Sequence, residues 1–206
     1  MSWSVTAGLP VLPPPCAGRK TRLFRIWTAP SLCRPSGQKV LWCNMTNYCI
    51  RNVTPADLDA VAAVEAACFP PAEAASREAF AYRIAVFPER FFVAETEDRI
   101  IGIINGCASN LPLIEDALFE PQGHEPDGMN QMIFGLAVLP EFQRQGIAAA
   151  LMQRLIDFAK QSGMKQVILT CKEQKIAYYS KFGFENRGIS GSVHGGSVWY
   201  DMILTL

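Results

Sequence analysis

The segment EFQRQGIAAALMQ, residues 141–153, has the residue types and spacing to bind a phosphate group. It joins an apolar run to an amphipathic run, which predicts a turn from a strand into a helix. The first N–H groups of a helix lack partners and carry the positive end of its dipole, so they attract anions. Gly146 and the alanines after it leave room for such a ligand, and Arg144 adds charge. A tight connection built from good helix formers explains the same residues, and neither GxGxxG nor GxxxxGK is present.

The cysteines, histidines and charges bear on metal and nucleic-acid binding. The seven cysteines form no CxxC pair and there are two histidines, so we expect no metal site. Unpaired thiols are typical of a reducing compartment and predict a cytoplasmic protein. Residues 1–44 contain six Lys and Arg and no Asp or Glu. The rest of the chain has thirteen basic and nineteen acidic residues, so its net charge is about −6. That balance disfavours nucleic-acid binding, and no window is apolar enough to cross a membrane.

Residues 1–44 differ in composition from the rest of the chain. They are rich in Pro, Gly and Ser, and no helical or strand periodicity persists in them. We predict a disordered or non-native extension over 1–44, with Met45 as an alternative start, and a single domain over 45–206. The Arg-rich, acid-free composition leaves an organelle transit peptide open.

From residue 48 onward, strand and helix patterns alternate. Thr54 with Asp57 marks a helix start, and Ser76 marks a second. Expected strands are 48–53, 90–97, 99–108, 130–139, 165–171, 183–190 and 196–206, and expected helices are 54–69, 77–87, 146–162 and 173–182. A tight turn near Asp98 joins the second and third strands. This order predicts a mixed α/β sheet with helices on both faces.

Two motifs in the C-terminal half carry a family resemblance. GLAVLPEFQRQGIAAALM at 135–152 and AYYSKFGF at 177–184 resemble the Gcn5-related N-acetyltransferase (GNAT) superfamily, which uses acetyl-CoA. With LTCKE at 169–173 and GGSVWYDM at 195–202 in matching order, the chain looks most similar to the serotonin (arylalkylamine) N-acetyltransferase family. The resemblance covers residues 49–206, most strongly from 129. It implies a GNAT fold of the α/β (α+β) class, with a mixed, mostly antiparallel sheet of six to seven strands and splayed middle strands.

The resemblance also implies where acetyl-CoA binds. The strand ending at Val138 and the strand ending near Cys171 would splay apart, and Gly135 would mark a bulge. The pantetheine arm would pair with the backbone of Leu136, Ala137 and Val138. The pyrophosphate would lie on Arg144, Gln145, Gly146, Ile147, Ala148 and Ala149.

The same resemblance implies catalytic roles. The Leu136 N–H would stabilise the oxyanion, and the Tyr179 hydroxyl would protonate the leaving thiolate. A tyrosine on an amphipathic helix is also a common core residue. Vertebrate members have two histidines where this chain has Met132 and Phe134, so we expect Glu73 to replace them as the base, as a glutamate in this region does in insect relatives. A solvated loop glutamate is the alternative.

Other polar residues are weaker candidates. Glu115 and Asp116 could bind or deprotonate an amine. His194 in the closing loop could contact the substrate, whereas His124 is expected to be an ordinary loop histidine. Cys171 near the splayed strand could carry an acetyl group, although we expect direct transfer without an acetyl-enzyme.

The expected acceptor pocket lies between ACFPPAE at 67–73 and the closing strands. Its aromatic walls would be Phe69, Phe134, Trp199 and Tyr200, with His194 nearby and Pro70 and Pro71 stiffening one side. Aromatic walls suit an arylalkylamine, although alternating apolar residues also suit a plain core.

The sequence therefore predicts an acetyl-CoA-dependent N-acetyltransferase acting on a small primary amine, as a monomer or homodimer. EAACFPP also looks like the ribosomal-protein alanine acetyltransferases, so a protein N-terminus is an alternative acceptor, and a polyamine is another. A non-catalytic acetyl-CoA-binding module is the alternative of a different class.

Overall fold

The computed structural model describes residues 47–97, 99–120 and 123–206. The expectations for 1–44 and for the turn at Asp98 lie outside the described residues. The strands are β1 Cys49–Asn52, β2 Phe91–Glu95, β3 Ile100–Asn105, β4 Ala108–Ser109, β5 Asn130–Ile133, β6 Gly135–Val138, β7 Gln166–Cys171, β8 Glu185–Ile189 and β9 Tyr200–Thr205. The α-helices are α1 Leu58–Cys68, α2 Arg77–Val86, α3 Ile147–Gln161 and α4 Ile176–Ser180.

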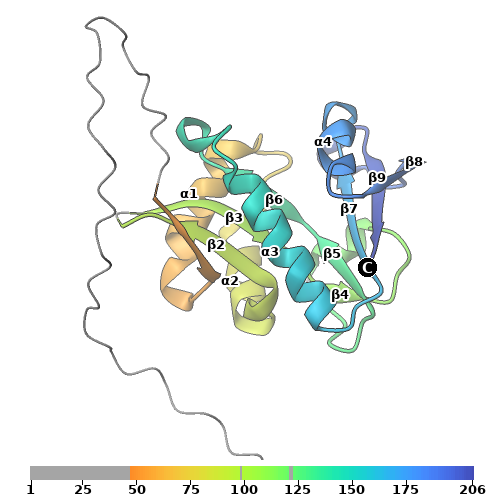
Figure 1. The fold of residues 1–206 in the computed structure, drawn as a ribbon, viewed down its shortest axis with the longest axis horizontal. Helices are drawn as coiled ribbons and strands as arrows, with labels where there is room; N and C mark the ends of the chain where they lie inside the picture. Colours follow the sequence, from red (N-terminus) through yellow and green to blue (C-terminus); the bar gives the residue numbers. More distant parts are fainter. Residues whose placement is uncertain (1–46, 98, 121–122) are drawn as a thin grey trace, which may run out of the picture. The chain divides into compact units, whose positions relative to one another are not determined.

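The strands form two hydrogen-bonded groups (Figure 1). The chain crosses between them after β3, again at Phe134 between β5 and β6, and again between β6 and β7. Their orders are β1-β2-β3-β6 and β4-β5-β7-β9-β8, and every neighbouring pair is antiparallel except β5 with β7. The predicted mixed, mostly antiparallel architecture is confirmed. The described residues hold more strands than the six or seven expected, because the predicted strands 130–139 and 99–108 are each divided in two.

The two middle strands diverge after Ile133. Up to that residue β5 pairs with β7, where Ile133 lies opposite Leu169. Beyond it β6 pairs with β3, and among the residues that the structure describes the end of β7 pairs with β9 alone. The Phe134 N–H donates to the Asn105 oxygen (2.9 Å), while Asn105 is also the register partner of Gly135. Two residues thus face one, as in a β-bulge, and the predicted splay is confirmed.

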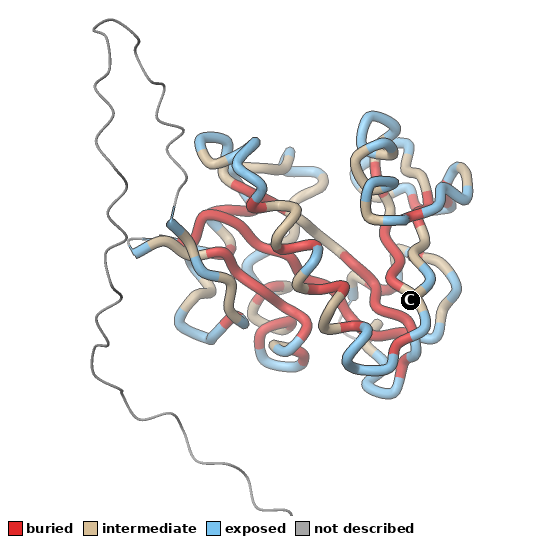
Figure 2. The backbone as a smooth tube through the Cα atoms, in the orientation of Figure 1, coloured by how far each residue is buried: buried red, intermediate tan, exposed pale blue. Residues whose placement is uncertain are grey.

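Helices cover both faces of β2, β3 and β6. On β2, Phe92 and Ala94 belong to the core beneath α3, and Phe91 and Val93 to the core beneath α1 and α2. Because strand side chains alternate between faces, this strand is buried on both sides (Figure 2). A Cβ on Gly102 would lie only 3.2 Å from the Leu151 side chain, so the glycine permits the close approach of α3.

Local sequence signals set the helix ends around the site. Thr54 and Asp57 form a capping box, and the Ser76 side chain accepts from the Ala79 N–H (3.2 Å). The predicted helix 173–182 is shorter: residues 173–175 form a 3₁₀ turn, and α4 ends at Ser180. Within the described part of the chain, no helix is long and apolar enough to cross a bilayer.

Candidate active site

The N-terminus of α3 is built as the sequence predicts. Gly146 has φ +83° and Arg144 has φ +61°, so the chain makes a left-handed turn before the helix. The first N–H to bond back is that of Ala150, to the Gly146 oxygen (3.0 Å). Within the described residues, the N–H groups of Ile147, Ala148 and Ala149 have no backbone acceptor. These free N–H groups, together with the positive end of the helix dipole, can bind an anion at the start of α3.

A cavity of about 450 Å³ lies beside this turn. It is lined by Leu136, Val138, Phe142, Gln143, Arg144, Gly146, Ile147, Ala148, Ala149, Lys175, Tyr178 and Tyr179. Of the residues expected to hold a cofactor, Ala137 and Gln145 do not line it. The Ala137 side chain is buried beneath α1, and the Gln145 side chain points back to the Glu141 oxygen (3.4 Å). Their predicted contacts would therefore involve backbone atoms.

The edge of β6 that faces the splay carries no paired strand within the described residues. The Leu139 N–H donates across to the Ile101 oxygen (2.9 Å). Since N–H groups alternate between the two edges of a strand, those of Leu136 and Val138 point to the opposite edge. The Leu136 N–H is thus directed into the gap, where the sequence predicts an oxyanion donor.

A second cavity, of about 440 Å³, lies on the other side of Leu136. The two cavities share three lining residues, Leu136, Lys175 and Tyr179. Burial, with smaller effects of Cys171 and Tyr178, raises the pKa of Tyr179 well above its ordinary value, so its hydroxyl is protonated at neutral pH. A protonated hydroxyl at the junction can donate a proton to a group arriving from either side.

The second cavity has aromatic walls, as predicted. Phe69, Phe119, Phe134 and Trp199 line it. Tyr200, predicted as another wall, is not among the lining residues and lies in β9 opposite Cys171. Consecutive residues of an extended segment point in opposite directions, so Trp199 and Tyr200 cannot share one wall. Phe119 was not predicted, because it comes from the 3₁₀ turn Asp116–Phe119 in a long loop.

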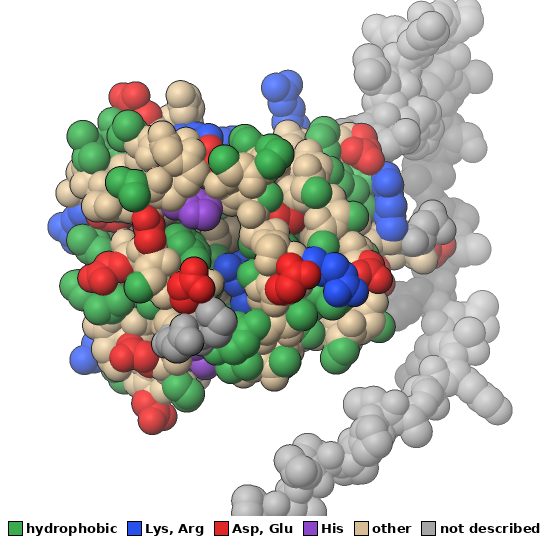
Figure 3. All heavy atoms as spheres, turned by 180° about the vertical axis from the view of Figure 1, so that it is seen from behind, with side chains coloured by type: hydrophobic (Ala, Val, Ile, Leu, Met, Phe, Trp, Pro, Cys, Tyr) green, Lys and Arg blue, Asp and Glu red, His purple; other side chains and the backbone are tan. Residues whose placement is uncertain are grey.

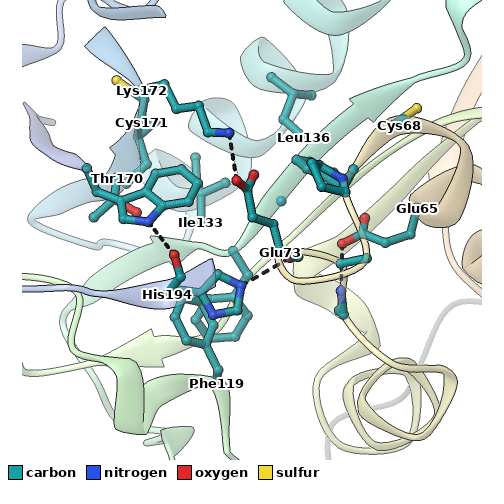
Figure 4. A pocket seen from close by; sticks show the side chains of 18 of the residues that line it. Glu65, Cys68, Glu73, Phe119, Ile133, Leu136, Thr170, Cys171, Lys172 and His194 are labelled. Carbon is teal, nitrogen blue, oxygen red and sulfur yellow. Dashed lines mark hydrogen bonds and ion pairs between the residues drawn. The ribbon is translucent and has the colours of Figure 1, made fainter. Parts of the chain in front are cut away.

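Two loops meet over this cavity, and Glu73 joins them (Figure 4). One loop follows α1 and the other links β8 to β9. The Glu73 Oε1 lies 2.7 Å from the Lys172 Nζ and accepts from the Ser197 hydroxyl (2.9 Å), and the Glu73 carbonyl oxygen lies 3.1 Å from the His194 Nε2. Trp199 Nε1 donates to the His194 oxygen (2.8 Å). Predicted residues Glu73 and His194 therefore meet at the cavity.

The Glu73 carboxylate is held in its charged form. Its side chain is 8% exposed. Burial raises its pKa, but the hydrogen bonds from Lys172 and Ser197, with the charge of Lys172, outweigh burial, and the pKa lies below its ordinary value. At neutral pH this group is an anion already bonded to two donors.

Glu65 of α1 is a cavity residue that the sequence did not single out. Its Oε1 accepts from the Ala75 N–H (3.1 Å), and its Oε2 is buried without a hydrogen-bond partner in the described residues. Burial raises the pKa of Glu65. The hydrogen bond from the Ala75 N–H and the charges of Arg83 and His194 act in the opposite direction but do not outweigh burial. The signal was a lone acid within the apolar run VAAVEAACF, residues 61–69.

Arg83 of α2 forms the floor beside Glu65. Its Nη1 donates to the Asn105 Oδ1 (3.0 Å), and its guanidinium lies 4.7 Å from the centre of the Phe134 ring. Burial lowers its pKa to about 10, so it stays charged at neutral pH. The cavity floor thus contains a buried arginine and a buried carboxyl.

The remaining candidates have other positions. Asp116 accepts from the Ser192 hydroxyl (2.5 Å) and the Val193 N–H (3.2 Å), so it holds the β8–β9 loop, and neither it nor Glu115 lines either cavity. His124 accepts from the Ala108 N–H (3.3 Å) and packs on a phenylalanine, away from both cavities. Cys171 lines the aromatic cavity, and burial raises its pKa to about 11.

Charges of both signs are mixed on the face seen in Figure 3. Lys and Arg side chains lie among Asp, Glu and apolar groups, and a hollow opens beside a histidine side chain. Among the described residues, no three His, Cys, Asp or Glu side chains are grouped as a metal site would require.

Comparisons with known proteins agree with this geometry. The model of the Acetyltransferase (GNAT) family matches residues 58–184. A probable hydrolase of Bacillus subtilis, YhcX, is 28% identical over 144 residues, which cover 66% of this chain and 28% of the relative. Human N-acetyltransferase 8 is 33% identical over 103 residues, which cover 48% of this chain and 40% of the relative. The matched segments thus span less than half the length of either relative.

Solved structures share the fold. The loading GNATL domain of CurA from Lyngbya majuscula superposes with a TM-score of 0.68 at 18% identity, covering 78% of this chain and 98% of that domain. Neither relative's name includes an arylalkylamine, so the narrower family assignment stays a prediction.

Proposed function

The chain belongs to the acetyltransferase (GNAT) family, and from that premise we propose that it transfers an acetyl group from acetyl-CoA to a small primary amine. The observation that carries this proposal is the junction of two cavities at Leu136 and Tyr179. One cavity ends at the donor-rich start of α3, which suits a pyrophosphate. The other has aromatic walls, which suit an organic acceptor.

In this proposal the chain aligns a direct transfer. The amine nitrogen attacks the thioester carbonyl carbon, and the C–S bond breaks. The Leu136 N–H donates to the carbonyl oxygen as negative charge develops on it. The Tyr179 hydroxyl gives its proton to the departing sulfur.

The thiol of Cys171 argues for direct transfer over an acetyl-enzyme. A nucleophilic cysteine acts as its thiolate, and burial raises the pKa of this thiol to about 11. The described residues place no cation in hydrogen-bond contact with it. It is therefore protonated at neutral pH and serves as a cavity wall.

We propose an arylalkylamine as the acceptor class because of the aromatic walls and the joined loops. A peptide would need an open groove between the loop after α1 and the β8–β9 loop. Glu73 ties these loops through Ser197 and His194, and a Cβ on Gly195 would meet Glu73 Cγ at 2.5 Å. Packing this tight favours a small acceptor over a chain, and the charged Glu73 carboxylate can attract its ammonium group.

We also propose the cytoplasm as its compartment. The described cysteines, Cys49, Cys68, Cys107 and Cys171, are all unpaired, which fits a reducing environment.

The test is release of the CoA thiol by purified full-length protein supplied with acetyl-CoA and an amine panel. The panel contains tryptamine, phenethylamine, spermidine and a short peptide with a free N-terminus. Turnover greatest on the aryl amines supports the proposal, and preference for the peptide or spermidine replaces the acceptor class. Tight acetyl-CoA binding without turnover on any amine would indicate a non-catalytic binding module.

A further inference from the structure

The buried carboxyl of Glu65 lies beside the reacting end of the acceptor cavity. It comes from α1, the residue is 5% exposed, and its Oε1 is fixed by the Ala75 N–H. Its Oε2 has no partner in the described residues, and a Cβ on Gly135 would lie 3.8 Å from it. Figure 4 shows Glu65 on the same side of the cavity as Leu136. Gly135 immediately precedes Leu136, whose N–H faces the gap.

Because Gly135 has no side chain, a group the size of a methyl can lie beside the buried Oε2 at ordinary contact distance. The same Cβ position is 3.5 Å from the Asn105 Nδ2, which is also buried and without a partner among the described residues. One unpartnered acceptor and one unpartnered donor therefore flank a single glycine. Buried polar groups normally have partners, so this pair indicates a place where a polar ligand atom belongs.

Arg83 and Asn105 set the orientation of these groups. The Arg83 Nη1 donates to the Asn105 Oδ1 (3.0 Å), which fixes the amide with its Nδ2 toward Gly135. The positive charge of Arg83 favours the charged form of Glu65 and so opposes the effect of burial, although the pKa of Glu65 is raised on balance.

The acceptor must lose a proton before it can attack. An alkylamine has a pKa near that of lysine, so roughly one molecule in a thousand is uncharged at neutral pH. A base works best when its pKa is near the working pH. Burial moves the pKa of Glu65 upward, toward that range, whereas the bonds from Lys172 and Ser197 move the pKa of Glu73 downward.

We propose that Glu65 takes the proton from the acceptor ammonium, and that Glu73 binds the cation and holds the two loops together. This inference rests on the proposed function. The first ammonium proton moves to the Glu65 Oε2, and the freed lone pair forms the N–C bond as the C–S bond breaks. The second nitrogen proton replaces the one that Tyr179 gives to the sulfur. Glu65 releases its proton to solvent after the amide leaves.

The test compares Glu65→Gln with Glu73→Gln over pH and over two acceptors. One acceptor is an aryl alkylamine that wild type acetylates. The other is a fluorinated analogue whose amine pKa lies below the assay pH, so that it arrives uncharged. The charged or titratable groups that interact with Glu65 are Cys68, Arg83 and His194, and none of them is changed in either variant.

Glu65→Gln should lower kcat/KM for the alkylamine about a hundredfold or more, the usual contribution of a general base, and should remove the acidic limb of the pH profile. For the fluorinated amine the loss should be within a few-fold. Glu73→Gln should raise KM for the charged acceptor and keep the acidic limb. Acetyl-CoA affinity should be unchanged in both.

Gly135→Ala provides a second variant. Its methyl group meets its neighbours at ordinary contact distances and its φ is not left-handed, so it should fold, and it should lower the alkylamine rate by separating the ammonium from Oε2. If Glu65→Gln lost activity equally on both amines, or kept the acidic limb of the pH profile, Glu65 would not be the base. The proposed function would still stand. A wild-type enzyme without turnover on any amine would overturn the proposed function and this role together.

Discussion

Gly195 and Gly196 offer a matched pair of substitutions that separates backbone strain from contact with Glu73. Both have left-handed φ, +61° and +69°. A Cβ at Gly195 would lie 2.5 Å from the Glu73 Cγ and 3.0 Å from the Ala72 oxygen, whereas a Cβ at Gly196 would meet nothing within 4 Å. Alanine at either site costs about 1 kcal/mol in backbone strain. Only Gly195→Ala must also push the two loops apart, by roughly 1 Å, because close-packed groups cannot interpenetrate.

The size of the effect follows from what that separation breaks. Overpacking typically costs about 1–3 kcal/mol, and 1 kcal/mol shifts Tm by roughly 2–4 °C in a domain of this size. We therefore expect Gly195→Ala to melt at least about 2 °C below Gly196→Ala. Displacement of Glu73 from the bound ammonium, a charged hydrogen bond worth about 1.5–3 kcal/mol, should raise KM for a cationic amine about tenfold or more.

The assay is thermal unfolding and initial-rate kinetics on the two variants side by side. Acetyl-CoA affinity should be the same in both, because the cradle at the start of α3 does not touch this loop. Equal Tm and equal KM in the two variants would refute the argument that the β8–β9 loop is seated on Glu73.

Four further outcomes are expected. Tyr179→Phe should lower kcat about a hundredfold with acetyl-CoA affinity unchanged by calorimetry; wild-type kcat would exclude Tyr179 as the proton donor. Gly146→Ala should weaken acetyl-CoA binding about tenfold through left-handed strain of about 1–2 kcal/mol, measured by the same titration. Cys171→Ala should stay active, and an inactive but folded variant would contradict direct transfer. The hydrogen bonds from Arg51 are the main cause that lowers the pKa of Asp57 to about 2. The charged Asp57 should therefore stabilise the fold above about pH 4, and this stability should be lost as the pH falls toward 2. The denaturant midpoints of wild type and Asp57→Asn should differ at neutral pH and converge near pH 2.

The sequence located those parts of the site that depend on local chemistry. The caps at Thr54 and Ser76 and the turn at Gly146 each depend on a few neighbouring residues, and the structure has all three where predicted. The motif around Tyr179 likewise placed that residue at the junction of the cavities.

Features set by distant pairing were not predictable in the same way. The splay and a bulge at Gly135 followed from the family resemblance, but the apolar pattern predicted one strand over 130–139, because its division at Phe134 depends on how Asn105 pairs across the sheet. Trp199 and Tyr200 were both predicted as cavity walls, and of the two Trp199 lines the cavity, because a shift of one residue moves a side chain to the opposite face. Glu65 was not predicted because its position beside Gly135 of β6 depends on how α1 packs on the sheet, and the sequence around a single acid in an apolar helix does not indicate this packing.

The two carboxyls of the acceptor cavity are eight positions apart in the chain, and their surroundings move their pKa values in opposite directions. Glu65 accepts one N–H bond, and its other carboxyl oxygen is buried without a partner among the described residues. Burial is therefore the largest effect on its pKa and raises it. Glu73 has Lys172 and Ser197 on the same oxygen, so the charged form dominates. When environments separate the pKa values of two acids, the acids can take different roles. A fixed anion can hold a cation in place, and only the group with the raised pKa is well matched to remove its proton.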